Sequence, residues 1–299
     1  MDIRGNLVRY LDNFEYEKDP RDAVMGAMDK LCRHSSAIEK LEGYVELYRN
    51  GTLDYEGLSA LAKESAAIAE INEKQSNFIH CVSLADHALP YFEKKGLGRE
   101  EWYDSMIDFK WKMRESYRLD GVWGINPEWF KRFFTADRIA FGRLQYNLLE
   151  SERTFKGKTV DVTKGQTVVT IHIPSDDRTP FSPENRLRSY ERAEKYYRNI
   201  MPEGKVIFRC GTWLLNTLHL EILPEGSNIR SFLDDFEMDP DSYDVADGDL
   251  WRIFYVRRYD GNPASLPEES SLMRAYKRHL MNGGHIGKMV GFRAGSAEK

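Results

Sequence analysis

Apolar residues recur at steps of three and four along the first part of the chain, up to about residue 135. This spacing places them on one face of a helix. The first helix shows it in Ile3, Leu7, Leu11 and Phe14. One long helix is expected from Glu56 to Leu89, because Pro90 ends the pattern there. We therefore predict an all-helical N-terminal domain over residues 1–135.

Beyond residue 135 the pattern changes to short runs rich in β-branched residues. The runs TVVTIHIP (167–174) and KVIFRC (205–210) are bounded by turn residues and predict strands. Between them, Ser182 as the N-cap and Pro183 as the first residue predict a helix. Later segments predict a helix from Ser227, a strand LWRIFYV (250–256) and a strand GKMVGF (287–292). Residues 136–299 are therefore predicted to form an α/β domain.

The composition narrows the class of protein. The 299 residues are 41% hydrophobic and 30% charged, with a net charge of −5, as in a soluble globular protein. The acidic balance argues against nucleic-acid binding, which needs clustered Lys and Arg, and fits a cationic small partner better. The three cysteines, Cys32, Cys81 and Cys210, are too far apart to predict a zinc site or a disulfide framework, so no metal is expected.

The first residues, MDIRGNLVRYLDNFEYEKDP, have acidic residues where a signal peptide needs an unbroken apolar core, and no run of apolar residues is long enough to span a membrane. We therefore expect a cytoplasmic protein without a membrane partner. A later segment, residues 233–249, carries eight acidic residues in seventeen and is interpreted as a solvated loop. Next to a cleft, the same run would attract a cationic amine.

Five segments, in this order, resemble bacterial GNAT-like acyltransferases that carry an all-helical N-terminal domain. They are FGRLQYNL (141–148), TIHIP (170–174), CGTWLLN (210–216), ILPEGSNIRSF (222–232) and SLMRAYKRHLMNGG (271–284). The resemblance implies a helical domain followed by a GNAT-like mixed-sheet domain. It also implies transfer of an acyl group from acyl-CoA or acetyl-CoA to an amine of a small molecule or peptide. In that fold two central strands splay, and the acyl-pantetheine arm lies in the gap.

The chain departs from that family in the loop that normally holds the CoA diphosphate. The equivalent segment, IPSDDRTPFSPENR (173–186), contains no glycine. The start of the following helix still favours an anion. Candidate CoA-binding residues are Arg178, Arg186 and Arg188 for the phosphates, with Ile173 and Trp213 near the gap. The missing glycines leave an alternative open, a GNAT-like binding or interaction module that has lost CoA.

Amine acylation needs a base for the ammonium nucleophile. His172 is the candidate, because it ends a strand and its side chain titrates near neutrality. The alternative is a histidine hydrogen-bonded within the sheet for structural reasons. Ser227 and Asn228 are candidates near the acyl or amine site, although either also suits a helix N-cap.

Three neighbouring residues are given structural interpretations. Trp213 fits a packing anchor as well as a wall of the gap. Cys210 has no adjacent base in the sequence to make it a nucleophile. His219 is expected on a strand, at the surface or within the sheet, and Glu221 would share its strand face.

Overall fold

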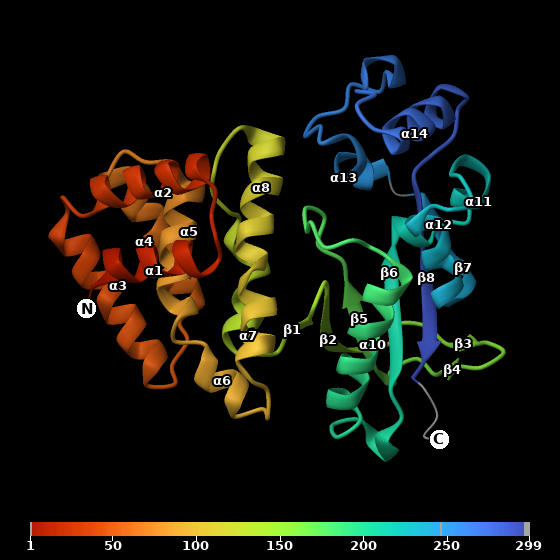
Figure 1. Cartoon of the computed structure of the whole chain (residues 1–299), viewed down its shortest axis with the longest axis horizontal. Coiled ribbons are helices and arrows are strands. Elements are labelled where there is room, and N and C mark those ends of the chain that lie inside the picture. The colour runs from red at the N-terminus through yellow and green to blue at the C-terminus, as the bar shows by residue number, and fades with distance from the viewer. Residues whose placement is uncertain (1, 246, 296–299) are drawn as a thin grey trace. The chain divides into compact units, whose positions relative to one another are not determined.

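The computed structural model describes residues 2–245 and 247–295 (Figure 1). It divides into two compact units. One comprises the chain up to Ala140 together with Pro174–Asp177, and the other comprises Phe141–Ile173 and Arg178–Lys299. Among the described residues, no helix combines the length and the apolar character needed to cross a membrane.

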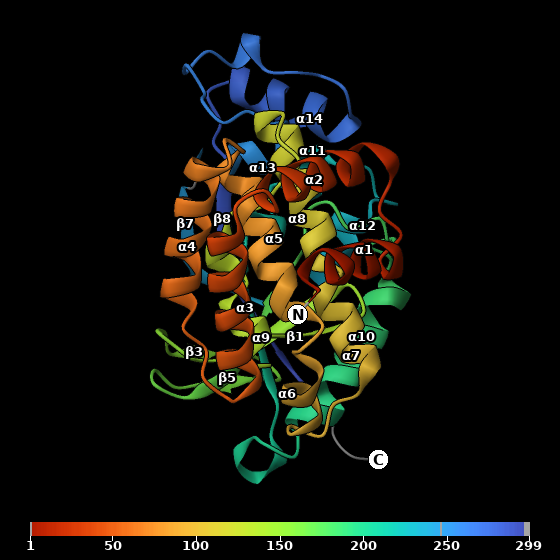
Figure 2. The ribbon, with the colours of Figure 1, turned by 90° about the vertical axis from the view of Figure 1, so that its left-hand side faces the viewer.

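The first unit is all helical, as predicted. Its helices are α1 (Ile3–Asn13), α2 (Lys18–Leu31), α3 (Ser35–Arg49), α4 (Tyr55–Ile68), α5 (Glu73–Ala85), α6 (Leu89–Glu93), α7 (Arg99–Met106), α8 (Asp108–Asp120) and α9 (Lys131–Phe134). Helix α5 is the centre of the unit, because every residue from Ser76 to Ala85 is buried. Helices α1 to α4 pack around it, and Figure 2 shows α3 and α4 side by side with α5. A helix that is buried on all sides need not be amphipathic.

The single long helix predicted from Glu56 to Leu89 is wrong, because the chain forms α4 and α5 there. The break lies at Glu70, whose φ of +51° is left-handed and incompatible with a continuous helix. Asn72 then caps α5, since its Oδ1 accepts a hydrogen bond from the Lys74 amide at 2.9 Å.

The mixed sheet has the strand order β1-β2-β5-β6-β8-β7, and all of it except Ile139 and Ala140 of β1 belongs to the second unit. The strands are β1 (Ile139–Phe141), β2 (Leu144–Glu150), β5 (Thr167–His172), β6 (Ile207–Thr212), β7 (Glu237–Val245) and β8 (Gly287–Ala294). Strands β5 and β6 are parallel and joined through helix α10 (Pro183–Tyr197), which confirms the predicted strand, helix, strand unit. The other described pairs, β2–β5, β6–β8 and β7–β8, are antiparallel.

The two faces of this sheet are covered differently. On one face lies α10, where the Tyr146 hydroxyl is 2.8 Å from Ser189 Oγ, and Tyr190 packs on Phe208 (Figure 1). On the other face lies a small hairpin of β3 (Phe155–Lys156) and β4 (Asp161–Val162). Its apolar residues form a core cluster with residues of the sheet. The hairpin contributes Phe155, Val160 and Val162, and the sheet contributes Val168, Ile207 and Phe292. This hairpin covers the end of β5 that is distant from His172.

Two sequence-based expectations for the second unit are wrong. Residues 250–256 do not form a strand, because Leu250–Phe254 is helix α13, which ends at Tyr255 with φ of +54°. The buried residues Leu250, Ile253 and Phe254 have helical spacing, and the β-branched and aromatic character of the run concealed it. The acidic segment expected to be a loop contains the edge strand β7, held by its pairing with β8.

Candidate active site

The parallel strands β5 and β6 separate toward their carboxyl ends. Their pairing covers only Val169↔Phe208 and Thr170↔Arg209. Beyond these pairs β5 stays paired with β2 as far as His172, and β6 stays paired with β8 as far as Thr212. Each strand therefore follows its outer neighbour, and a gap opens between them. This is the splay that the resemblance to GNAT-like proteins implies, and ligands of α/β sheets bind at such carboxyl ends.

Cys210 lies where this gap begins. Its Sγ is 3.8 Å from the Ile171 carbonyl across the two strands. The side chain is buried, and desolvation raises the pKa of the thiol to about 12, although Arg209 acts in the opposite direction. A thiol with that pKa supplies no thiolate near neutral pH. Cys210 therefore acts as a packing residue at the gap.

Polar side chains cluster on one face of β2 and β5 beside the gap. The register places Gln145 opposite His172 and Asn147 opposite Thr170, and all four share one face of the sheet. Gln145, Asn147 and Thr170 are buried, whereas His172 is partly exposed. A buried sheet face is ordinarily apolar, so a polar cluster at a strand end is a candidate for ligand binding.

A hydrogen bond to Asn147 sets the orientation of the His172 ring. Asn147 Nδ2 donates to the Leu148 carbonyl at 3.0 Å, which leaves its Oδ1 to face the ring. Oδ1 lies 2.8 Å from His172 Nε2 and accepts a hydrogen bond from it. In the neutral imidazole the lone pair then resides on Nδ1. The ring is thus held in the tautomer in which Nδ1 is the basic atom.

Gln145 is the residue of this cluster that sequence reasoning missed. Its side chain is 2% exposed, and its Oε1 accepts no hydrogen bond from any residue that the structure describes. Leaving a buried acceptor unpaired costs about 1–3 kcal/mol. The sequence signal was the alternation of Gln145 and Asn147 with Tyr146 and Leu148. That alternation is ordinarily interpreted as a solvent-facing polar edge.

Arg186 is a structural residue of α10. It is only 1% exposed, and its Nε donates to Asp235 Oδ2 at 2.6 Å. Its Nη1 donates to the carbonyl oxygens of Phe181 at 2.9 Å and Asn228 at 3.3 Å. Because these bonds engage the guanidinium, we do not retain Arg186 as a ligand for CoA phosphates. It instead holds the start of α10 next to the segment that contains Ser227 and Asn228.

Ser227 and Asn228 lie at the start of helix α12 (Asn228–Phe232), as predicted. Ser227 is the N-cap, and its Oγ accepts from the Ile229 amide at 3.3 Å. The Asn228 carbonyl accepts from Arg186 and, at 3.1 Å, from Ser231 Oγ. Ser227 thus has the N-cap role that the sequence left open, whereas Asn228 is the first residue of the helix. The bond from Arg186 to the Asn228 carbonyl holds this segment beside α10.

Residues 174–177 of the glycine-free loop belong to the helical unit and are anchored to its helix α8. Within the helical unit, Asp176 pairs with Arg118 at 2.8 Å, and Ser175 Oγ donates to Glu115 Oε2 at 2.6 Å. At the start of α10, Ser182 Oγ accepts from the Asn185 amide at 3.4 Å, so part of the helix N-terminus is already capped.

Two arginines near that helix start remain exposed, Arg178 and Arg188, and neither forms an ion pair with a residue in the described ranges. They are therefore the phosphate candidates that the geometry retains. Ile173, the last residue of the sheet unit before the loop, is partly exposed next to His172.

Trp213, His219 and Tyr276 form a buried cluster past the end of β6. The Trp213 ring meets the His219 and Tyr276 rings edge-on, at centroid distances of 5.7 and 5.9 Å. This supports packing as the role of Trp213. The predicted strand position of His219 is wrong, because His219 begins helix α11 (His219–Ile222), is 0% exposed, and has its Nε2 2.6 Å from the Tyr276 hydroxyl.

Two buried histidines predict acid-sensitive stability. Burial lowers the pKa of His80 in α5 and of His219 to about 4, from an ordinary value of 6.5. The unfolded chain therefore takes up protons between pH 6.5 and 4 that the folded chain does not, so stability falls as the pH falls. We expect each histidine to cost on the order of 2 kcal/mol of unfolding free energy between pH 7 and pH 5.

Denaturant unfolding at several pH values measures this effect. His80→Gln and His219→Gln are each expected to flatten the decline, whatever they do to stability at pH 7. Variants that keep the full pH dependence of the wild type would contradict the assignment.

Five of the eight acidic residues of the segment 233–249 lie next to basic side chains. Asp235 pairs with Arg186, Asp239 with Arg153 at 2.5 Å, Asp244 with Lys288 at 3.0 Å, Asp247 with His285 at 3.0 Å, and Asp249 with Arg252 at 2.9 Å. Part of the negative charge of this segment is thus compensated within the fold, which weakens the interpretation that it attracts a cationic substrate. No group of three or more His, Cys, Asp or Glu side chains in the described residues is placed to hold a metal ion.

Comparison with known families and structures follows the same division of the chain. The sequence matches the family described as GNAT-like C-terminal domain over residues 139–293, and the one described as N-acyltransferase N-terminal domain over residues 5–136. A comparison with curated proteins finds no match.

Two solved structures share the fold over nearly the whole chain. An acyltransferase in complex with decanoyl-CoA is 20% identical, with a TM-score of 0.71 over 95% of this chain and 85% of that one. An acyltransferase in complex with decanoyl-CoA and teicoplanin is 19% identical, with a TM-score of 0.70 over 95% and 86%. At such identities the likeness establishes the fold. The predicted fold class, a helical domain before a GNAT-like mixed sheet, is confirmed.

Proposed function

Because the chain belongs to the family with a GNAT-like C-terminal domain, which follows an N-acyltransferase N-terminal domain in the sequence, we propose that it transfers an acyl group from acyl-CoA to an amine. The observation that carries the proposal is the gap between β5 and β6, with the polar cluster of Gln145, Asn147, Thr170 and His172 beside it. The gap is the place where the acyl-pantetheine arm binds in this fold. The acceptor is proposed to be a small molecule or peptide.

Each residue of the cluster is assigned one role in the reaction. Gln145 Oε1 accepts a hydrogen bond from the acceptor ammonium, and His172 Nδ1 removes its proton. Asn147 acts as a positioning residue, because it fixes the tautomer of His172. The neutral amine then attacks the thioester carbonyl, the C–N bond forms and the C–S bond breaks. The nitrogen gives up its second proton as the amide forms, and this proton neutralises the departing CoA thiolate. Arg178 and Arg188 are proposed to contact the CoA phosphates.

A thermal shift of the purified protein with acetyl-CoA, decanoyl-CoA and free CoA tests the proposal. The likeness to an acyltransferase structure that holds decanoyl-CoA is the reason for including the longer chain. A ligand at 100 times its dissociation constant is expected to stabilise the folded chain by about 2.7 kcal/mol. No stabilisation by any CoA species would favour the alternative, a non-catalytic GNAT-like interaction module. That alternative is motivated by the glycine-free loop at 173–186.

Replacing Gln145 with methionine separates a binding role from a structural one. Gln145→Met removes a buried acceptor that has no partner, so the unfolding free energy is expected to stay the same or rise by about 1 kcal/mol. The KM for the acceptor amine is expected to rise about tenfold or more, because a hydrogen bond to a charged group is lost. Steady-state kinetics and denaturant unfolding measure the two effects. A destabilised variant with an unchanged KM would assign Gln145 to the core instead.

A further inference from the structure

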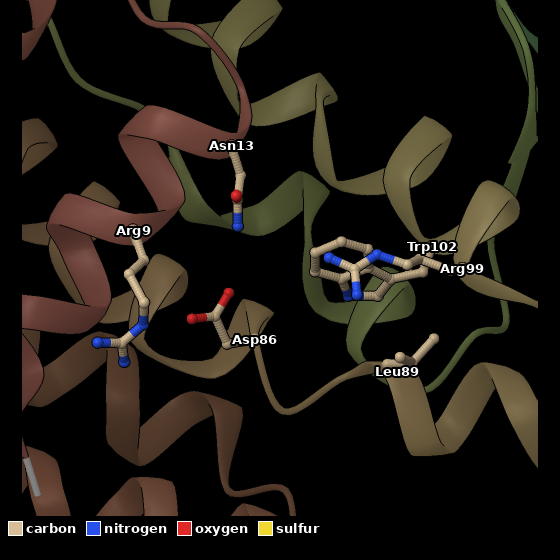
Figure 3. A pocket seen from close by; sticks show the side chains of 6 residues that line it. All are labelled: Arg9, Asn13, Asp86, Leu89, Arg99 and Trp102. Atoms are coloured by element: carbon tan, nitrogen blue, oxygen red, sulfur yellow. The ribbon is translucent and has the colours of Figure 1, made fainter.

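A second candidate site lies within the helical unit, in a cavity of about 220 Å³ (Figure 3). Helix α1 contributes Arg9 and Asn13, the end of α5 contributes Asp86, and α6 contributes Leu89. Helix α7 completes the lining with Arg99 and Trp102. Figure 3 shows the Asn13 amide and the Asp86 carboxylate pointing toward one another, with Arg9 on one side and Arg99 and Trp102 on the other.

The charged groups of this cavity surround it without pairing. The Asp86 carboxylate forms no hydrogen bond or ion pair with residues 2–245 or 247–295. Arg9 donates a hydrogen bond to Asn6 Oδ1, but neither Arg9 nor Arg99 has an ion-pair partner in these ranges. Burial raises the pKa of Asp86 above its ordinary value, while Arg9, His87 and Arg99 act to lower it. The arginines are thus close enough to influence the carboxylate but do not reach it. A ligand in the space between them would contact both signs of charge.

The apolar wall of the cavity is rigid. The Trp102 ring is 5% exposed and packs against Phe14, with 5.8 Å between the ring centroids. Its Nε1 donates to the Ala85 carbonyl at 2.9 Å. The guanidinium of Arg99 lies over the ring, 5.8 Å from its centre. An indole held in this way forms part of the cavity wall beside an arginine.

The position of Asp86 favours a cation next to it. Asp86 is the C-cap of α5, where the helix dipole is negative, so the carboxylate and the helix end repel each other. An ammonium group at this point would be stabilised by both. A simple anion would meet Asp86, and a simple cation would meet two arginines. A ligand that pairs with Arg9, Asp86 and Arg99 together must carry both a positive and a negative group.

We infer that this cavity binds a free α-amino acid with an apolar side chain. Arg9 and Arg99 contact its carboxylate, and Asp86 with the Asn13 side-chain oxygen contacts its ammonium group. The side chain lies against Trp102 and Leu89. The inference concerns the helical unit alone and does not rest on acyl transfer in the other unit.

Calorimetry on the full chain tests the inference with L-alanine, L-leucine and L-phenylalanine. At least one is expected to bind. If leucine binds best, 4-methylpentanoate keeps its carboxylate without the amine, and 3-methylbutylamine keeps its amine without the carboxylate. Each single-charge analogue is expected to bind at least tenfold more weakly, because one charge-assisted contact is lost.

Variants connect the binding to the cavity. Asp86→Asn and Arg99→Gln are expected to weaken amino-acid binding at least tenfold. Arg4→Gln is the matched control on α1, because Arg4 lies outside the cavity in an exposed ion pair with Asp29, and it should leave binding unchanged. An analogue with one charge that binds as tightly as the amino acid would overturn the inference. So would the absence of binding by all three amino acids, or binding that survives both cavity variants.

Discussion

His172→Ala is expected to lower kcat for amine acylation by about 10²- to 10⁴-fold, the usual contribution of a positioned general base. The ring is partly exposed and is hydrogen-bonded to Asn147, so the loss in unfolding free energy is expected to be about 1 kcal/mol. The variant should therefore fold, bind acyl-CoA and fail at turnover. Steady-state kinetics beside a thermal shift with acyl-CoA measure the two properties on one sample.

Chemical rescue makes this result specific to a base. Added imidazole is expected to restore part of the turnover of His172→Ala, because it can occupy the vacated volume and accept the proton. In the wild type, the acid limb of kcat/KM reports protonation of the catalytic base. Asn147→Asp is the matched variant, because a carboxylate facing Nε2 stabilises the imidazolium and moves that limb to higher pH. An unfolded His172→Ala protein would assign His172 to the structure of the sheet, and full activity without imidazole would show that it is not the catalytic base.

The parts of the fold set by local chemistry could be predicted from the sequence. The helix that links β5 and β6 follows from Ser182 and Pro183, and its N-cap is where these residues place it. The start of α12 at Ser227 follows from the same rule. The edge strand β7 could not be predicted, because its acidic residues oppose strand propensity and only pairing with β8 and ion pairs such as Asp239 with Arg153 hold it.

The candidate site was predicted in part. His172 could be found because it is a titratable residue at a strand end. Gln145 could not, because its importance comes from the register that places it opposite His172 and from its burial without a partner. Arg186 was assigned to phosphate because charge near a helix start suggests an anion site. Only the fold shows that the guanidinium of Arg186 is hydrogen-bonded to Asp235, which lies 49 residues later in the chain.

Arg186→Met is expected to destabilise the second unit by about 3–5 kcal/mol, the usual cost of removing one partner of a buried ion pair. The Asp235 carboxylate would lose its partner, and the carbonyls of Phe181 and Asn228 would lose a donor. Denaturant unfolding measures the loss.

The double variant Arg186→Met with Asp235→Asn is expected to recover part of that stability, because the uncompensated charge is gone. Arg188→Gln, two residues along the same helix and exposed, is the matched control and should change stability by no more than about 0.5 kcal/mol. If Arg188 contacts a CoA phosphate, Arg188→Gln should leave the stability unchanged but weaken acyl-CoA binding in a salt-dependent manner. Equal stability of Arg186→Met and the wild type would show that the α10–α12 arrangement does not depend on this ion pair.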